Sequence, residues 1–257
     1  MTPLEGVLLA LAGLAAGIAN AVAGGGSLLS FPALLAAGYP AVDANVTNTV
    51  SLWPGYLSGG LAYRDDLRTQ RDRVVALAVT AGIGGAAGTV LLLVAPPGIF
   101  EAIVPYLVLV AVLLLAAQPR IAARVQRRSA RRVGGAARPD HASIGLHAST
   151  FAAATYGGYF GGGLGVVLLA VLGIFLPDDL TRLNGLKNAL SLVVNTVALV
   201  GFGLFGPVAW AAVAVVGPAS LAGGVLGSRL ARRLSATVLR RIVVVWGTAV
   251  AIRLLVG

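Results

Sequence analysis

The sequence predicts an all-α integral membrane protein, an inverted-repeat helical bundle with about 8–10 membrane segments. Three observations lead to this fold class: the composition, the placement of the arginines, and two glycine triplets at matching places in the two halves. Of the residues, 58% are hydrophobic and 11% are charged, whereas an ordinary soluble domain carries about 25% charged residues. Apolar runs recur from residue 4 to residue 256, so we expect a single transmembrane domain over residues 1–257.

The first repeat, about residues 4–117, begins with an apolar segment at 4–22. Glu5 stands where a cleavable signal peptide would have Lys or Arg, so we expect this segment to be retained as a membrane helix. The next segment, 26–38, would form about 20 Å of helix, which is too short to cross a hydrocarbon core of about 30 Å. The remaining segments of this half are 43–62, 74–95 and 98–117.

The second repeat, about residues 142–257, follows a basic loop at 118–141 and shows the same order of segments. A long segment at 142–159 precedes a short one at 163–176. Both short segments follow a glycine triplet, so two of the expected membrane segments are short or broken. The remaining segments of this half are 182–205, 208–228 and 238–256.

The charge distribution sets the orientation of these segments in the cell membrane. The net charge is +10, and the arginines fall mainly in three stretches, 63–73, 118–140 and 228–241. The positive-inside rule places all three in the cytoplasm, close to anionic lipid headgroups. Segment 43–62 then enters from outside and segment 182–205 leaves from inside, so the two halves are inverted and both chain ends lie outside. The basic stretches lack interleaved aromatic residues, which argues against nucleic-acid binding.

The glycine triplets, Gly24–Gly26 and Gly161–Gly163, interrupt apolar sequence at corresponding places in the two halves. Irregular backbone at membrane depth is tolerated only where protein or a water-filled cavity satisfies its polar groups, and paired broken helices are typical of secondary transporters. Glycines would let a ligand approach backbone N–H groups there. The alternative is that they only allow close helix packing. Their matching positions favour breaks over packing.

Polar residues follow each triplet on a membrane segment. In the first half Asn45 and Asn48 are three residues apart. In the second half Asn184, Lys187 and Asn188 lie on one helix face, which Ser191 and Asn195 extend. Lys187 is the only lysine beside eighteen arginines. Such a stripe favours a polar interior that holds an anion, and the alternative for Lys187 is a side chain that snorkels to the cytoplasmic surface.

The residue content argues against several other function classes. Cysteine is absent and the two histidines have no neighbour at metal-ligand spacing, so we expect no metal and no cofactor. The membrane segments offer no nucleophile beside a base and no carboxylate pair, so we do not expect an enzyme. The acidic residues lie at segment ends or in loops, which favours facilitated or potential-driven efflux over proton coupling through a carboxylate. A non-transporting membrane scaffold and an anion channel stay open as alternatives.

Four motifs together resemble the TauE/SafE family of sulfite and organosulfonate exporters. They are a glycine cluster followed by "FPALLAAG", then "NVTNTVS", "YFGGGLG" and "LNGLKNALSLVVN", and the resemblance covers about residues 6 to 255. It implies a plasma-membrane carrier for a small sulfur-containing or carboxylate anion. "NVTNT" stands where many members have a Gly-Thr-Ser type segment. The resemblance therefore indicates the family more closely than it indicates the substrate.

The sequence therefore predicts a secondary transporter that exports a small anion, such as sulfite, an organosulfonate or a carboxylate, by alternating access. Charge-assisted hydrogen bonds from one ammonium, neutral amides and backbone N–H groups would hold such an oxyanion. The expected substrate-binding residues are Gly24, Gly25, Gly26, Asn45, Asn48, Gly161, Gly162, Gly163, Asn184, Lys187 and Asn188.

Overall fold

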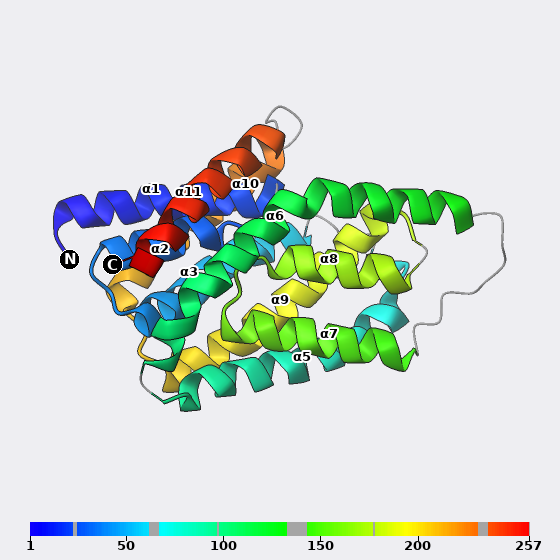
Figure 1. Cartoon of the computed structure of the whole chain (residues 1–257), viewed down its shortest axis with the longest axis horizontal. Coiled ribbons are helices and arrows are strands. Elements are labelled where there is room, and N and C mark those ends of the chain that lie inside the picture. The colour runs from blue at the N-terminus through cyan, green and yellow to red at the C-terminus, as the bar shows by residue number, and fades with distance from the viewer. Residues whose placement is uncertain are drawn as a thin grey trace.

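The computed structural model describes residues 1–22, 25–61, 67–96, 98–132, 143–176, 178–230 and 236–256. Within these ranges every regular element is a helix and none is a strand, which confirms the predicted all-α class (Figure 1). The principal helices are α1 (Pro3–Val22), α2 (Ser27–Ala36), α3 (Ala41–Leu61), α5 (Arg71–Val94), α6 (Ile99–Arg132), α7 (Ile144–Tyr159), α8 (Leu164–Phe175), α9 (Leu180–Phe205), α10 (Trp210–Leu230) and α11 (Ala236–Val256).

Membrane-length helices are present in both halves of the chain. Among the described residues, five helices are long and apolar enough to cross a bilayer, namely α1, α5, α6, α9 and α10. The two short apolar helices are α2 and α8, at the places where the sequence predicts short segments after the glycine triplets. With 10 and 12 residues they reach only about 15–18 Å. The protein is thus a multi-pass membrane protein, and its helices α2 and α8 are too short to span the bilayer.

The helix boundaries follow the hydropathy of the sequence closely, with one extension. Helix α6 does not end near residue 117, where the apolar run stops, but continues to Arg132. Alanine and arginine are strong helix formers, so the chain stays helical after it becomes polar. The first part of the expected basic loop, residues 118–132, is therefore helix, and the rest of that loop lies outside the described residues.

Helix packing divides most of the structure into two bundles. In the first bundle, α1, α2 and α3 pack with α10, which comes from the second half of the chain. In the second bundle, α7, α8 and α9 pack with α5, which comes from the first half. The bundles meet where α3 packs on α9, while α6 packs on both α8 and α11, and α11 packs on α2. Figure 1 shows α5 and α7 side by side and far from α1 and α11.

Glycines bring α10 and α5, the helices that pack with the other half of the chain, into backbone contact with their neighbours. A Cβ atom at Gly17 of α1 would lie 2.2 Å from the Ser220 carbonyl oxygen of α10, and one at Gly223 would lie 2.1 Å from the Leu14 oxygen. In the second bundle, a Cβ at Gly88 of α5 would lie 2.0 Å from the Thr155 oxygen of α7. These distances leave no room for a side chain, so each bundle depends on glycine for its closest helix pair.

The helix pairs that pack together follow the same pattern in both halves of the chain. If α1, α2, α3, α5 and α6 correspond to α7, α8, α9, α10 and α11, the contact of α1 with α10 becomes that of α7 with α5. The contact of α3 with α10 likewise becomes that of α9 with α5, and α3 with α9 maps onto itself. This correspondence follows the repeat that the glycine triplets indicate in the sequence.

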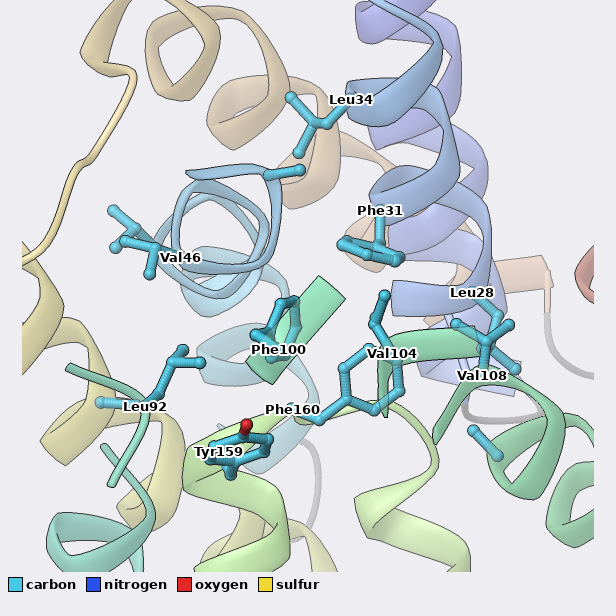
Figure 2. Close-up of a cluster of buried hydrophobic side chains, with 14 of the residues drawn as sticks. Leu28, Phe31, Leu34, Val46, Leu92, Phe100, Val104, Val108, Tyr159 and Phe160 are labelled. Atoms are coloured by element: carbon cyan, nitrogen blue, oxygen red, sulfur yellow. The ribbon is translucent and has the colours of Figure 1, made fainter. Parts of the chain in front are cut away.

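A buried aromatic cluster lies where the two halves meet (Figure 2). The ring of Phe31 on α2 meets that of Phe160 at 5.7 Å between centroids, nearly perpendicular, and Phe100 on α6 lies 5.7 Å from Tyr159. Edge-to-face rings of this kind fill space at interior packing density. The cluster joins the short helix of the first half to the end of α7 in the second half.

Candidate functional site: two glycine breaks that meet beside α6

The second break is the turn at residues 160–163 between α7 and α8. Gly161 and Gly163 both have φ of +77°, a left-handed conformation that L side chains rarely adopt. Gly163 is the N-cap of α8, and no side chain caps that helix. The Tyr156 hydroxyl donates to the Gly162 carbonyl and fixes the turn. The glycines are needed here for backbone conformation, which confirms that this triplet interrupts the helix.

The first break lies between α1 and α2. Gly24 falls outside the described residues, and Gly25 has φ of +87°. Gly26 has helical dihedrals, but a Cβ there would lie 2.1 Å from the Ala16 carbonyl oxygen of α1. Its N–H donates to Asn20 Oδ1 at 2.7 Å. At this break glycine therefore serves both functions that the sequence left open, an unusual backbone conformation and close packing.

Helix α6 covers both breaks and shows how close together they are. A Cβ at Gly163 would meet Ala111 at 3.4 Å, and one at Gly25 would meet the Leu115 side chain at 3.0 Å. Ala111 and Leu115 are one helical turn apart, which corresponds to about 6 Å along α6. The two short helices α2 and α8 thus begin beside neighbouring turns of the same helix, α6.

Helix α3 carries polar side chains to both breaks. Asn45, which is 1% exposed, donates from Nδ2 to the Tyr159 carbonyl oxygen at 2.9 Å. One turn later, Thr49 Oγ1 lies 4.0 Å from where a Gly161 Cβ would be. Asn48 lies instead against α2, and its Oδ1 accepts a 2.5 Å hydrogen bond from Ser30. Asn45 and Asn48 therefore face different half-helices rather than one shared cavity wall.

The Lys187 side chain lies over the first turn of α8. A Cβ at Gly165 would be 3.6 Å from Lys187 Cδ and 3.8 Å from Cε. The Lys187 stem therefore packs against the first turn of α8, which follows the second break.

Three polar residues of the α9 stripe are half-buried and unpaired. Within the described part of the chain, Asn184, Lys187 and Asn188 make no hydrogen bond and no ion pair to protein. Asn195, farther along the helix, donates to the Ser191 carbonyl oxygen at 2.8 Å and is buried. The stripe thus divides into a buried, satisfied end and an end with free donors beside α8.

The acidic residues nearest to Lys187 in sequence are engaged elsewhere. Asp179 caps α9 by accepting from the Arg182 N–H at 2.9 Å. Asp178 pairs with Arg73 of α5 and lies 3.7 Å from Arg182. These contacts tie the start of α9 to the start of α5 and leave the charge of Lys187 uncompensated by either carboxylate.

The structure places Asn45 at the second break, Lys187 beside the first turn of α8 that follows it, and Asn48 beside the first half-helix. Sequence reasoning did not single out several polar groups that lie against the breaks. The two halves share a signal that would have helped: "TNTVSL" at 47–52 matches "KNALSL" at 187–192, which pairs Thr47 with Lys187. The additional polar residues at the breaks are Asn20, Ser30, Thr49 and Tyr156.

Three relatives cover most of the chain. A "Probable membrane transporter protein" of Haemophilus influenzae is 26% identical over 93% of this chain and 89% of its own length. "Probable membrane transporter protein ORF9" of Sinorhizobium sp is 28% identical, covering 96% and 91% of the two chains. "Probable membrane transporter protein YfcA" of Escherichia coli is 26% identical, covering 98% and 90%.

No solved structure matches the chain. The family model described as sulfite exporter TauE/SafE matches residues 9–254, which is nearly the whole sequence. This match agrees with the broken helices, the membrane-length helices and the names of the relatives. The chain therefore belongs to the sulfite exporter TauE/SafE family of membrane transporters.

Proposed function

We propose that the protein is a secondary transporter that exports a small anion, such as sulfite, an organosulfonate or a carboxylate. The observation that carries this proposal is Lys187, whose stem packs against the first turn of an uncapped helix and whose ammonium group has no ion-pair partner among the described residues. The N-terminus of a helix attracts anions through its free N–H groups and its dipole. A lysine at the same place adds a full positive charge, so the two features favour the same ligand.

Alternating access would use the two bundles as its moving parts. Glycine contacts hold α1 against α10 and α5 against α7, so each bundle is expected to move as one body. The seam between the bundles is the packing of α3 on α9, and both of these helices carry residues of the candidate site. A small rotation at this seam would expose the second break first to one side of the membrane and then to the other.

The proposal is tested by anion flux in proteoliposomes. Lys187→Ala should lower the initial rate of sulfite efflux by roughly tenfold or more, because a hydrogen bond to a charged group is lost. Lys187→Arg should restore flux only in part, because a planar guanidinium differs in shape from a compact ammonium. Arg229→Ala, which removes an exposed cation at the end of α10, is the matched control and should retain flux.

Two results of this experiment would contradict the proposal. Wild-type efflux equal to that of protein-free vesicles for every anion tested would favour a membrane scaffold. Efflux that rises linearly with anion concentration without saturating would favour a channel. Normal flux in Lys187→Ala would remove the lysine from the site and leave only backbone and amide groups to hold an anion.

A further inference from the structure

Asn45 has one hydrogen-bonding atom without a partner. The side chain is 1% exposed, and Nδ2 donates to the Tyr159 carbonyl oxygen at 2.9 Å. This bond fixes the amide orientation, because a flipped amide would set two oxygens against each other. The other atom, Oδ1, is buried and has no hydrogen-bond partner among the residues that the structure describes. It is an acceptor that lacks a donor there, at the second break.

Three hydroxyl groups at the two breaks donate to other acceptors. The Thr49 hydroxyl donates to the Asn45 backbone oxygen at 3.0 Å, and the Tyr156 hydroxyl donates to Gly162. The Ser30 hydroxyl donates to Asn48 Oδ1 at 2.5 Å. The residue that Asn45 contacts, Tyr159, packs its ring against Phe100 in the aromatic cluster. A buried polar atom in such surroundings is costly unless something brings it a donor.

An anion that carries only acceptor atoms would satisfy Lys187 and the first turn of α8, but it would leave Asn45 Oδ1 unpaired. We propose that the preferred anion also bears a hydrogen-bond donor on its organic part, such as a hydroxyl group or an amino group, and that Asn45 Oδ1 accepts from it. Asn45 is then a specificity-determining residue. This inference rests on the proposed function, since it refines the substrate class of that site.

The test compares two anions that differ in one hydroxyl group. Ethanesulfonate and 2-hydroxyethanesulfonate are both strong-acid anions, so neither crosses the vesicle membrane as a neutral acid. Saturable flux of each is measured in wild-type proteoliposomes, together with the concentration that gives half-maximal rate. The hydroxylated anion should be favoured by roughly tenfold in transport efficiency, which is the usual effect of satisfying one buried polar group. This comparison needs no variant.

Two variants locate the donor contact. Asn45→Leu replaces the amide by an apolar group of similar size and should bring the efficiency ratio of the two anions to about one. Thr150→Ala is the matched control, because the Thr150 hydroxyl is also buried and unpaired but lies about two turns before the end of α7. The ratio of the transport efficiencies of the two anions in Thr150→Ala should equal the ratio in the wild type.

Equal efficiency for the two anions in the wild type would overturn the inference and leave the proposed transport function standing. A preference that persists in folded Asn45→Leu would also overturn it, because the donor would then be recognised elsewhere. Absence of saturable flux for both anions, with sulfite flux intact, would restrict the site to smaller oxyanions and contradict the inference. Absence of flux for sulfite as well would contradict the proposed function itself.

Discussion

Single residues differ in how far the sequence alone could place them. Lys187 stands out because it is a lone ammonium among amides on an apolar segment, and the structure finds it unpaired beside α8. The contact of Asn45 with Tyr159 could not be predicted, because 114 residues separate the two in sequence. The contact of Asn48 with Ser30 could not be predicted either, because the sequence does not show how the short helix that carries Ser30 is oriented.

An acidic residue two positions before Asn45 offers a test of energy coupling. Asp43 lies in the first turn of α3, at the end of the helix and ahead of the buried polar residues. Asp43→Asn should leave both the rate of anion efflux and its response to an imposed pH gradient unchanged, because no proton is expected to travel on this carboxyl group. The measurement is efflux with and without the gradient, with Glu101→Gln, which changes an exposed acid in the first turn of α6, for comparison.

If Asp43→Asn abolishes the response to the pH gradient while sulfite still binds, then proton coupling through that carboxyl group replaces facilitated efflux.

At the level of helices, the sequence predicted the elements well because membrane segments are defined by apolar length. The two short helices appear where hydropathy and the glycine triplets place them, within a few residues. The extension of α6 to Arg132 was not predicted. The segment after residue 117 is rich in arginine and therefore suggests a loop in a hydropathy profile, although alanine and arginine both have high helix propensity. Hydropathy reports burial in lipid and not the end of a helix.

The glycine contact between α5 and α7 predicts a position-specific effect of alanine. Gly88→Ala should lower the melting temperature of the purified protein, because its Cβ would lie 2.0 Å from the Thr155 carbonyl oxygen and the helices would have to separate. The cost of such overpacking is about 1–3 kcal/mol. Gly82→Ala, on the same helix, would place its Cβ at an ordinary 3.7 Å from Val193 and should have little effect.

Equal melting temperatures for Gly88→Ala and Gly82→Ala in the same detergent would show that α5 and α7 are not in backbone contact.

The arrangement of the whole molecule was the least predictable part. The sequence suggests two repeats, but it gives no indication that each bundle takes one helix from the other repeat. That exchange depends on complementary surfaces of helices far apart in the chain, such as Gly17 of α1 against Ser220 of α10. Composition fixed the class of protein, whereas long-range packing fixed which helices can move together.

The two-bundle arrangement predicts which distances change during transport. Because the native chain has no cysteine, pairs of spin labels can be placed at exposed positions. Labels at Leu11 of α1 and Leu221 of α10 lie within the first bundle, and their distance distribution should not respond to saturating sulfite. Labels at Leu11 and Val79 of α5 lie on different bundles, and their distribution should shift.

A shift for the pair Leu11 and Leu221 without one for Leu11 and Val79 would mean that the repeats themselves, and not the swapped bundles, are the moving bodies.

The anion site at the second break can be observed by determining the structure of the protein with selenite, a heavier analogue of sulfite that anomalous scattering can locate. The selenite oxygens should accept hydrogen bonds from Lys187 Nζ and from the N–H groups in the first turn of α8, so that selenium lies beside the Lys187 stem and the uncapped helix. Selenite bound only at the basic stretches 63–73, 118–140 and 228–241, with the second break free of selenium, would contradict the anion site described above.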